Sequence, residues 1–207
     1  MTPLIVQKTL LLPGPSEDDQ RAHDQRITDA LGFDRLTIPL AVLKRLPDLV
    51  RENPSLPCII GRVGDGYRLI DVGTARSYSV ALDLGTTNLV ALLYDNIART
   101  DVLTRSLENP QIEYGSDIMT RMHHAMSTRR DEVYRALLTG INSLIRDLCK
   151  QAGIRNHEIH AVTAAGNTVM SHFFLGLDIS TIPVAPFVPV VRTPGFFTAS
   201  ELSLAIN

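Results

Sequence analysis

The sequence predicts an α/β fold in which a mixed sheet covered by helices follows a small α+β domain. After residue 75, the apolar patterns follow one another as three strands, a helix, a strand and a helix. Before residue 75, two short helical patterns lead into a hairpin. With 44% hydrophobic and 20% charged residues, the composition is that of an ordinary globular chain. The expected domains are therefore residues 1–74 and residues 75–207.

The first expected domain is small. Its segment 13–19, Pro-Gly-Pro followed by Ser-Glu-Asp-Asp, predicts a turn and a helix N-terminus. Apolar residues then recur in 27–31 and 38–49, a pattern that indicates two short helices. A Gly-Asp-Gly turn separates two apolar runs in 58–72, which predicts a hairpin. Because about 70 residues is near the lower limit for a self-sufficient core, this domain is expected to depend on its neighbour.

The second expected domain contains six regular elements. In chain order these are strands over 78–84, 88–94 and 102–106, a long helix over 116–152 broken near Ser127 and Thr128, a strand over 157–164 and a helix over 169–175. Apolar residues three to four positions apart between Val133 and Leu148 predict the buried face of the long helix. Four prolines preclude a regular helix or a central strand in the apolar segment 182–194. That segment is either a tucked loop or a docking surface, and the sequence does not decide.

Composition and charge exclude several classes of function. The net charge is −2 and no run of Lys and Arg is longer than Arg129-Arg130, so a nucleic-acid partner is not expected. Cys58 and Cys149 are too few for a disulfide framework or a four-thiolate metal site, and each is expected to be a small buried residue. The N-terminus lacks a signal-peptide pattern, and the most apolar segment, 182–191, is too short and too rich in proline to span a bilayer. A cytoplasmic protein without membrane contacts is expected.

The clearest chemical signal follows the first strand of the second domain. Asp83 lies at the end of an apolar strand, and Gly85, Thr86 and Thr87 form a short turn before the next strand. Gly85 lets backbone N–H groups approach an anion, and the two threonines add hydroxyl donors. Asp83 would repel a phosphate, so its carboxylate makes sense if a hydrated Mg²⁺ lies between the two. The alternative is a plain β-hairpin with a polar turn.

The segment Asp83-Leu84-Gly85-Thr86-Thr87-Asn88 resembles the first phosphate loop of the actin, sugar-kinase and heat-shock-chaperone ATPase superfamily, whose halves have a ribonuclease-H-like fold. More narrowly, three segments are similar to the ATP-dependent reductive activators of corrinoid proteins: 109–121 with its Asn-Pro-Gln and Tyr-Gly-Ser-Asp motifs, 165–177 beginning Ala-Gly-Asn-Thr, and Ala-Pro-Phe-Val-Pro-Val at 185–190. The likeness covers most of residues 78–207. Residues 1–74 resemble, more weakly, the small middle domain that precedes the ATPase core in that family.

The resemblance implies an ATP-dependent redox activator. Such a protein uses ATP to deliver a low-potential electron, and it returns a cobalt(II) corrinoid on a partner corrinoid protein to cobalt(I), with ATP binding driving a conformational switch. Family members carry an N-terminal two-iron ferredoxin domain, whose cluster needs four thiolates that Cys58 and Cys149 cannot provide. The second half of the ATPase would lie beyond Asn207. The chain is therefore expected to be the middle fragment of an iron–sulfur protein and to be inactive by itself.

By similarity, the first loop would bind ATP. The resemblance assigns the β and γ phosphates to the backbone and hydroxyls of Gly85, Thr86 and Thr87, and it makes Asn88 a further cofactor-binding residue. It makes Asp83 the catalytic residue, which would hold Mg²⁺ through water. Because positioning and charge neutralisation do most of the work in phosphoryl transfer, few covalent participants are expected.

A second cofactor-binding segment is expected at Gly166, Asn167 and Thr168, where a strand ends and a helix begins. The backbone amides at a helix N-terminus favour an anion. The alternative, which does not exclude the first, is that Asn167 caps the helix. Asn167 could point into the cleft between the two halves of such an ATPase, and four residues that precede the long helix are also expected near this cleft: Asn109, Gln111, Tyr114 and Asp117. Asp117 is alternatively a structural charge at a helix N-terminus.

Two other functions stay open from the sequence. A small-molecule kinase of the same superfamily, such as a sugar kinase, would need a general-base Asp, and Asp117 and Asp178 are the tempting positions. A non-catalytic interaction module would use the N-terminal unit and segment 182–194, and it would tolerate Asp83→Ala without loss of any activity. The sequence also leaves open the identity of the corrinoid protein, the electron donor, and whether the protein forms a homodimer.

Overall fold

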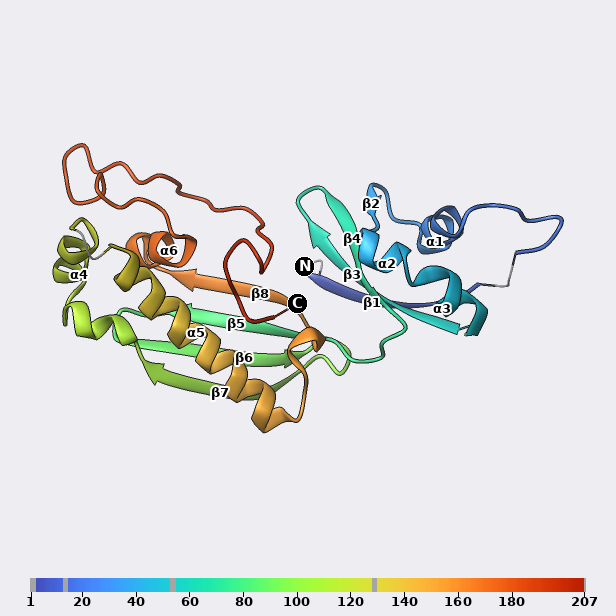
Figure 1. Ribbon diagram of the computed structural model, residues 1–207, viewed down its shortest axis with the longest axis horizontal. Helices are drawn as coiled ribbons and strands as arrows, with labels where there is room; N and C mark the ends of the chain where they lie inside the picture. Colours follow the sequence, from blue (N-terminus) through green and yellow to red (C-terminus); the bar gives the residue numbers. More distant parts are fainter. Residues whose placement is uncertain (1–2, 13–14, 53–54, 128–129, 207) are drawn as a thin grey trace. The chain divides into compact units, whose positions relative to one another are not determined.

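The computed structural model describes residues 3–12, 15–52, 55–127 and 130–206. The chain forms two compact units, which are Met1–Tyr78 with Asn96–Arg99, and Ser79–Asp95 with Thr100–Asn207. Each unit has its own four-stranded sheet with helices packed against it (Figure 1). The predicted α/β class, with mixed sheets and helices, is confirmed.

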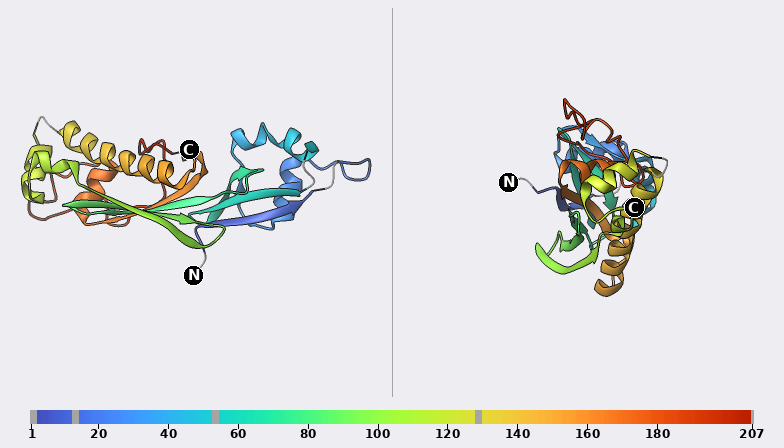
Figure 2. Two further views of the ribbon diagram at one scale, coloured as in Figure 1. Left: turned by 90° about the horizontal axis from the view of Figure 1, so that it is seen from below. Right: turned by 90° about the vertical axis from the view of Figure 1, so that its left-hand side faces the viewer.

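The first unit contains, among its described residues, the elements β1 (Ile5–Leu11), α1 (His23–Leu31), β2 (Leu36–Thr37), α2 (Leu40–Leu43), α3 (Leu46–Glu52), β3 (Ser55–Val63) and β4 (Gly66–Val72). The strand order is β1-β3-β4-β2, with β3 antiparallel to both of its neighbours and β2 parallel to β4. The three helices lie on one face of this sheet (Figure 2). Their apolar side chains, such as Ile27 and Leu46, meet Leu56 and Leu69 of the sheet in one buried core.

The start of this unit differs from the prediction. Strand β1 was not expected because its middle, residues 7–9, is polar and interrupts the apolar run. Helix α1 begins at His23 and not at the acidic segment, because the backbones of Ser16 and Asp19 bond to each other in a separate turn. The predicted turn residues 13–14 lie outside the described residues. The predicted hairpin is present as β3 and β4.

The second unit contains, in chain order, β5 (Tyr78–Leu84), β6 (Asn88–Asp95), β7 (Thr100–Glu108), the 3₁₀ helix η1 (Pro110–Tyr114), α4 (Ile118–Ala125), α5 (Arg130–Ala152), the 3₁₀ helix η2 (Asn156–Glu158), β8 (Ile159–Gly166) and α6 (Thr168–Leu175). The strand order is β7-β6-β5-β8, and β6 and β7 are antiparallel. The arrows of the neighbouring strands β5 and β8 run in the same direction (Figure 1). Their carboxyl ends therefore meet at one edge of the sheet.

Helix α5 covers one face of this sheet (Figure 2). Its buried residues recur every three or four positions from Val133 to Leu148, which confirms the predicted buried face. Gly140 allows a close approach to η1, because a Cβ atom at this position would stand 2.9 Å from ring atoms of Pro110. The helix is thereby packed against the segment that leads from β7 to α4.

The predicted long helix is two helices. Helix α4 ends at Ala125 and α5 begins at Arg130, so the interruption falls where the break was predicted. Of the two residues named for that break, Ser127 lies in a turn and Thr128 lies outside the described residues.

Residues 177–206 form no helix or strand, as the four prolines predict. Several of their large apolar side chains are exposed: Val184, Phe187, Val188, Val190, Phe196 and Phe197. Among the helices of the described residues, none is both long enough and apolar enough to cross a bilayer.

Candidate functional site

Close packing at Gly166 brings the two predicted cofactor-binding segments together, and Gly85 shapes the first of them. Gly85 follows β5, and a Cβ atom there would stand 2.3 Å from the Asn88 carbonyl oxygen, so only glycine fits this turn. Gly166 ends β8, and a Cβ atom there would stand 2.9 Å from the Leu84 Cβ. Because Leu84 immediately precedes Gly85, the turn after β5 lies beside the start of α6.

The polar side chains at this junction face solvent. Asp83 is exposed while Leu82 and Leu84 are buried, so its carboxylate lies on the sheet face opposite to that of the two leucines. Thr86 is half-buried and Thr87 is exposed. Within the described residues, the Asp83 carboxylate and the two threonine hydroxyls have no hydrogen-bond or ion-pair partner. These groups are free to meet a ligand.

Helix α6 begins at the same place, and Gly166, Asn167 and Thr168 are all exposed there. Asn167 is the N-cap, because its Oδ1 accepts a hydrogen bond from the Met170 N–H at 2.9 Å. The Asn167 side chain therefore caps helix α6, which is the alternative that the sequence left open. The N–H groups of Thr168 and Val169 have no partner in the described part of the chain, and they lie at the positive end of the helix dipole. An anion at this end of α6 would meet both.

Buried donors hold three successive carbonyl groups of the turn after β5. The Asn109 Nδ2 donates to the Gly85 carbonyl at 2.9 Å, and the Asn109 N–H donates to the Thr87 carbonyl at 2.8 Å. Between them, the Arg121 Nη1 donates to the Thr86 carbonyl at 2.5 Å. In a planar trans peptide the N–H points opposite to the preceding C=O. The N–H groups of Thr86 and Thr87 therefore point away from these donors.

Asn109 and Gln111 are fully buried and support each other. The Gln111 N–H donates to the Asn109 Oδ1 at 3.0 Å, and the Gln111 Nε2 donates to the Val133 carbonyl of α5 at 3.0 Å. Both side chains were expected near the cleft, but their burial keeps them from contacting a ligand. They are supports of the turn. Tyr114, at the end of the same 3₁₀ helix, is half-buried.

Arg121, on α4, is also fully buried. Its Nε donates to the Gly115 carbonyl at 2.7 Å, so one guanidinium joins the turn after β5 to the segment before α4. Burial lowers the pKa of Arg121 and the charge of Asp117 opposes that shift, while a guanidinium stays protonated in proteins. Beyond the family resemblance, the sequence carries no signal for this role, because an Arg on a short helix is usually exposed.

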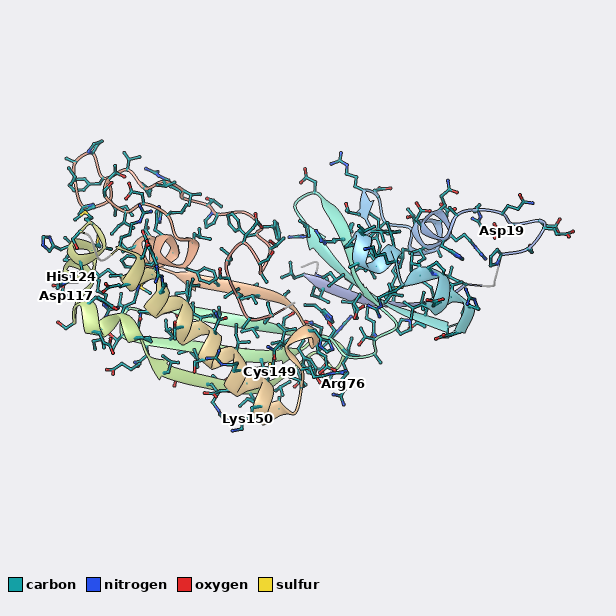
Figure 3. The ribbon with its side chains drawn as sticks, viewed as in Figure 1. Asp19, Arg76, Asp117, His124, Cys149 and Lys150 are labelled. Atoms are coloured by element: carbon teal, nitrogen blue, oxygen red, sulfur yellow. The ribbon has the colours of Figure 1, made fainter. Side chains whose placement is uncertain are left out.

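Asp117 caps the start of α4 (Figure 3). Its carboxylate accepts hydrogen bonds from the Thr120 hydroxyl and from the N–H groups of Met119 and Thr120. These bonds, the hydroxyl's above all, lower the pKa of Asp117. Asp178 is held in the same way by the hydroxyl and N–H of Ser180, which lower its pKa. Both carboxylates therefore have local structural partners in the described part of the chain.

The described residues offer little to a metal beyond Asp83. They contain no group of three or more His, Cys, Asp or Glu side chains that could hold a metal ion. A lone carboxylate suits Mg²⁺, which keeps most of its water ligands. Burial raises the pKa of Cys58 to about 12 and also raises that of Cys149. Two buried thiols in different units do not fit a four-thiolate iron–sulfur cluster.

Residues 78–207, which carry both loops of the candidate site, match the model of a family described as the RACo middle region. The chain belongs to the RACo middle region family. The matched residues run from β5 through α6 to the proline-rich segment. They therefore include every residue that the resemblance assigned to ATP or to Mg²⁺.

Two longer proteins are similar to this member of the RACo middle region family. Corrinoid activation enzyme RamQ of Eubacterium limosum is 30% identical over 149 residues, which are 69% of this chain and 25% of that enzyme. The solved structure of a reductive activator for corrinoid, iron-sulfur protein gives a TM-score of 0.90 at 30% identity, over 100% of this chain and 34% of that one. An archaeal actin homologue gives a TM-score of 0.32 at 12% identity, too low to support an argument. The chain thus spans a quarter of the curated relative and a third of the structural one.

Proposed function

We propose that this chain supplies part of the nucleotide site of an ATP-dependent redox activator. The observation that carries the proposal is the contact of Gly166 with Leu84, which gathers a free carboxylate, two free hydroxyls and a helix N-terminus in one place. Such a set of groups suits a Mg²⁺-bound polyphosphate. Membership of the RACo middle region family, and the names of its two corrinoid-activating relatives, support a role in corrinoid activation.

In the intact protein, residues 75–207 form the first lobe of an actin-like ATPase domain, and residues 1–74 form the small domain before it. A second lobe outside these 207 residues completes the binding of ATP. The protein works in the cytoplasm with a partner corrinoid protein, whose cobalt(II) it returns to cobalt(I). Because the second lobe and the electron source lie elsewhere, the 207-residue chain by itself is inactive.

Each residue of the proposed site has its own role in binding MgATP. Thr86 and Thr87 would donate N–H and hydroxyl hydrogens to the β and γ phosphates, and Thr168 would donate its N–H from the start of α6. Asp83 would hold Mg²⁺ through water. Gly85 keeps a Cβ atom out of the turn. Bound MgATP supplies the positive charge of its metal, which neutralises the phosphates, so this chain positions the reacting groups and forms no covalent bond to them.

ATP binding drives a conformational switch in this proposal. To move a two-state equilibrium from 1:99 to 99:1, a ligand must bind the favoured state more tightly by about 5.5 kcal/mol. An unfavourable one-electron transfer becomes tenfold less favourable for each ~59 mV of potential, which is a physical reason to couple it to ATP. The electron comes from an iron–sulfur cluster outside this chain, since Cys58 and Cys149 do not fit one.

The proposal is tested in the full-length protein with Asp83→Ala and, as a matched control, Asp101→Ala at an exposed position of β7. Calorimetric titration measures MgATP binding, and absorbance follows reduction of the cobalt(II) corrinoid partner. We expect Asp83→Ala to weaken both by about tenfold or more, which is about 1.4 kcal/mol, and Asp101→Ala to leave both unchanged.

Other results would replace this function. A wild-type protein that binds neither ATP nor a corrinoid protein would contradict it outright. Phosphorylation of a sugar or polyol by the wild type would favour the kinase, although Asp117 caps α4 and Asp178 is bonded to Ser180. Full activity of Asp83→Ala would favour the non-catalytic interaction module.

A further inference from the structure

Helix α4 buries the guanidinium of Arg121, which is unusual for a charged side chain. Arg121 is 0% exposed, and within the described residues it makes no ion pair. Its Nη2 is buried there without a hydrogen-bond partner. Removing a charged group from water is costly unless specific bonds compensate, and an apolar side chain of similar volume would fill the space without that cost. The bonds that Arg121 does make therefore indicate what it is for.

Those bonds join two segments that are far apart in sequence. The Nη1 reaches the Thr86 carbonyl in the turn after β5, and the Nε reaches the Gly115 carbonyl before α4. The planar guanidinium presents both donors in a fixed geometry. Gly115 packs closely against the first turn of α4, because it has a φ of 147° and a Cβ atom there would stand 2.7 Å from the Thr120 Cβ. Arg121 therefore joins Thr86 to the closely packed segment before α4.

The orientation of one peptide follows from this contact. The Thr86 carbonyl and the Thr87 N–H belong to the same planar unit, so holding the carbonyl toward Arg121 directs the N–H the opposite way. Asn109 fixes the two flanking carbonyls, but it has no bond to the central one. Without Arg121, the Thr86 carbonyl would lose the hydrogen bond that orients the peptide between Thr86 and Thr87. Donors that are aligned before the ligand arrives bind it more tightly than donors that must be ordered on binding.

We propose that Arg121 is the positioning residue of this turn: its guanidinium directs the Thr87 N–H toward the β and γ phosphates of MgATP, and it links the turn to the start of α4. The inference rests on the proposed nucleotide function. It differs from that function in placing the determinant of phosphate affinity on a buried side chain that never touches the ligand.

The test compares Arg121→Ala, Arg121→Lys and the control Met122→Ala in the full-length protein. Met122 is the next residue of α4 and is buried, so its truncation disturbs the same helix without removing a donor to the turn. Calorimetry measures affinity for MgATP and for AMP, which lacks the β and γ phosphates, and thermal unfolding verifies that each variant is folded. We expect Arg121→Ala to lower the affinity for MgATP about tenfold or more, which equals about 1.4 kcal/mol. The affinity for AMP should fall less than about twofold.

Arg121→Lys should also lower the affinity for MgATP, because one ammonium group does not reproduce the two donors of the planar guanidinium. Met122→Ala should change the ratio of MgATP to AMP affinity less than about twofold, even if it lowers the melting temperature by several degrees. If Arg121→Ala does not fold, Arg121→Lys decides by the same ratio.

The inference is overturned if the Arg121 variants keep the wild-type ratio of MgATP affinity to AMP affinity. They could do so by binding MgATP normally, or by losing affinity for MgATP and for AMP to the same extent. Those outcomes would leave the nucleotide site itself intact. If the wild type shows no MgATP binding, the proposed function fails first and the inference fails with it.

Discussion

Gly166 lies so close to Leu84 that a Cβ atom on the glycine would stand 2.9 Å from the Leu84 Cβ and 3.2 Å from the Leu84 carbonyl oxygen. The contact joins two turns that are about eighty residues apart in the chain. It is possible only because β5 and β8 are neighbours whose carboxyl ends meet at one edge of the sheet. The phosphate-binding groups of one turn and the helix N-terminus after the other are thereby held together by backbone packing.

Gly166→Ala tests this packing directly. The added methyl group should force the start of α6 away from β5, lower the free energy of unfolding by about 1–3 kcal/mol and weaken MgATP binding by the full-length protein. Gly85→Ala should be at least as damaging, because its Cβ would stand 2.3 Å from a backbone oxygen. Chemical denaturation and calorimetry measure the two effects. Gly195→Ala is the matched control, since no atom of the described residues lies within 4 Å of a Cβ built there. A Gly166→Ala protein that behaves like Gly195→Ala would refute the close contact.

The sequence predicted those features that depend on local pattern. The turn after β5 was visible because a carboxylate, a glycine and two threonines stand between two apolar strands, and the buried face of α5 was visible in its spacing. Strand β1 was missed because an edge strand need not be apolar along its whole length. Local pattern also placed the start of α1 too early, since the turn at Ser16 and Asp19 closes on itself.

The scaffold of the turn could not be predicted from pattern. The bond from Asn109 to Gly85 spans 24 residues, and the bond from Arg121 to Thr86 spans 35. No periodicity or spacing rule connects residues at such distances, and only the folded chain shows that they meet. The sequence predicted Asn109 near the interdomain cleft, and its burial with a bond to the Gly85 carbonyl is seen only in the folded chain.

Asp117 should contribute to stability in a pH-dependent way. Its pKa in the folded protein is lowered from the ordinary value of 3.8, so its contribution is fully present above pH 3.8 and is lost as pH falls through the lowered pKa. Asp117→Asn isolates the charge, because Asn is also a good N-cap. The difference in unfolding free energy between wild type and Asp117→Asn, measured from pH 7 to pH 2.5, should shrink below pH 3.8 and not above it. A difference that stays constant to pH 2.5 would show that the charge plays no part.

The two cysteines should report separately on the two units. Cys58 is buried in the first unit and Cys149 in the second, and burial raises the pKa of both thiols, that of Cys58 to about 12. Because only the thiolate reacts, we expect alkylation by iodoacetamide at pH 8 to be at least about tenfold slower in the native protein than in denaturant. Cys58→Ala leaves only the Cys149 thiol to react, and Cys149→Ala leaves only the Cys58 thiol, so each variant measures one unit. Rapid labelling of either native thiol would contradict its burial.

His172 should hold the proline-rich segment against α6. It is buried, and its Nε2 accepts a hydrogen bond from the Val190 N–H at 3.1 Å, while its Nδ1 lies 2.7 Å from the Thr168 carbonyl oxygen. Since an N–H can donate only to an unprotonated nitrogen, the hydrogen must be on Nδ1. The imidazole ¹⁵N spectrum should therefore show the Nδ1–H tautomer. The Nε2–H tautomer would mean that the bond to Val190 is absent.

His172→Phe keeps a ring at this buried position but removes the hydrogen-bond acceptor. The Val190 N–H should therefore exchange with deuterium about tenfold faster or more. This factor corresponds to a local opening whose free energy falls by about 1.4 kcal/mol. The control is Asn142→Ala on α5, because the Asn142 side chain bonds the Ala205 N–H at 2.7 Å and not Val190. It should speed exchange at Ala205 and leave Val190 unchanged. If both variants accelerated both amides equally, residues 177–206 would open as one piece, and His172 would have no local role in holding them.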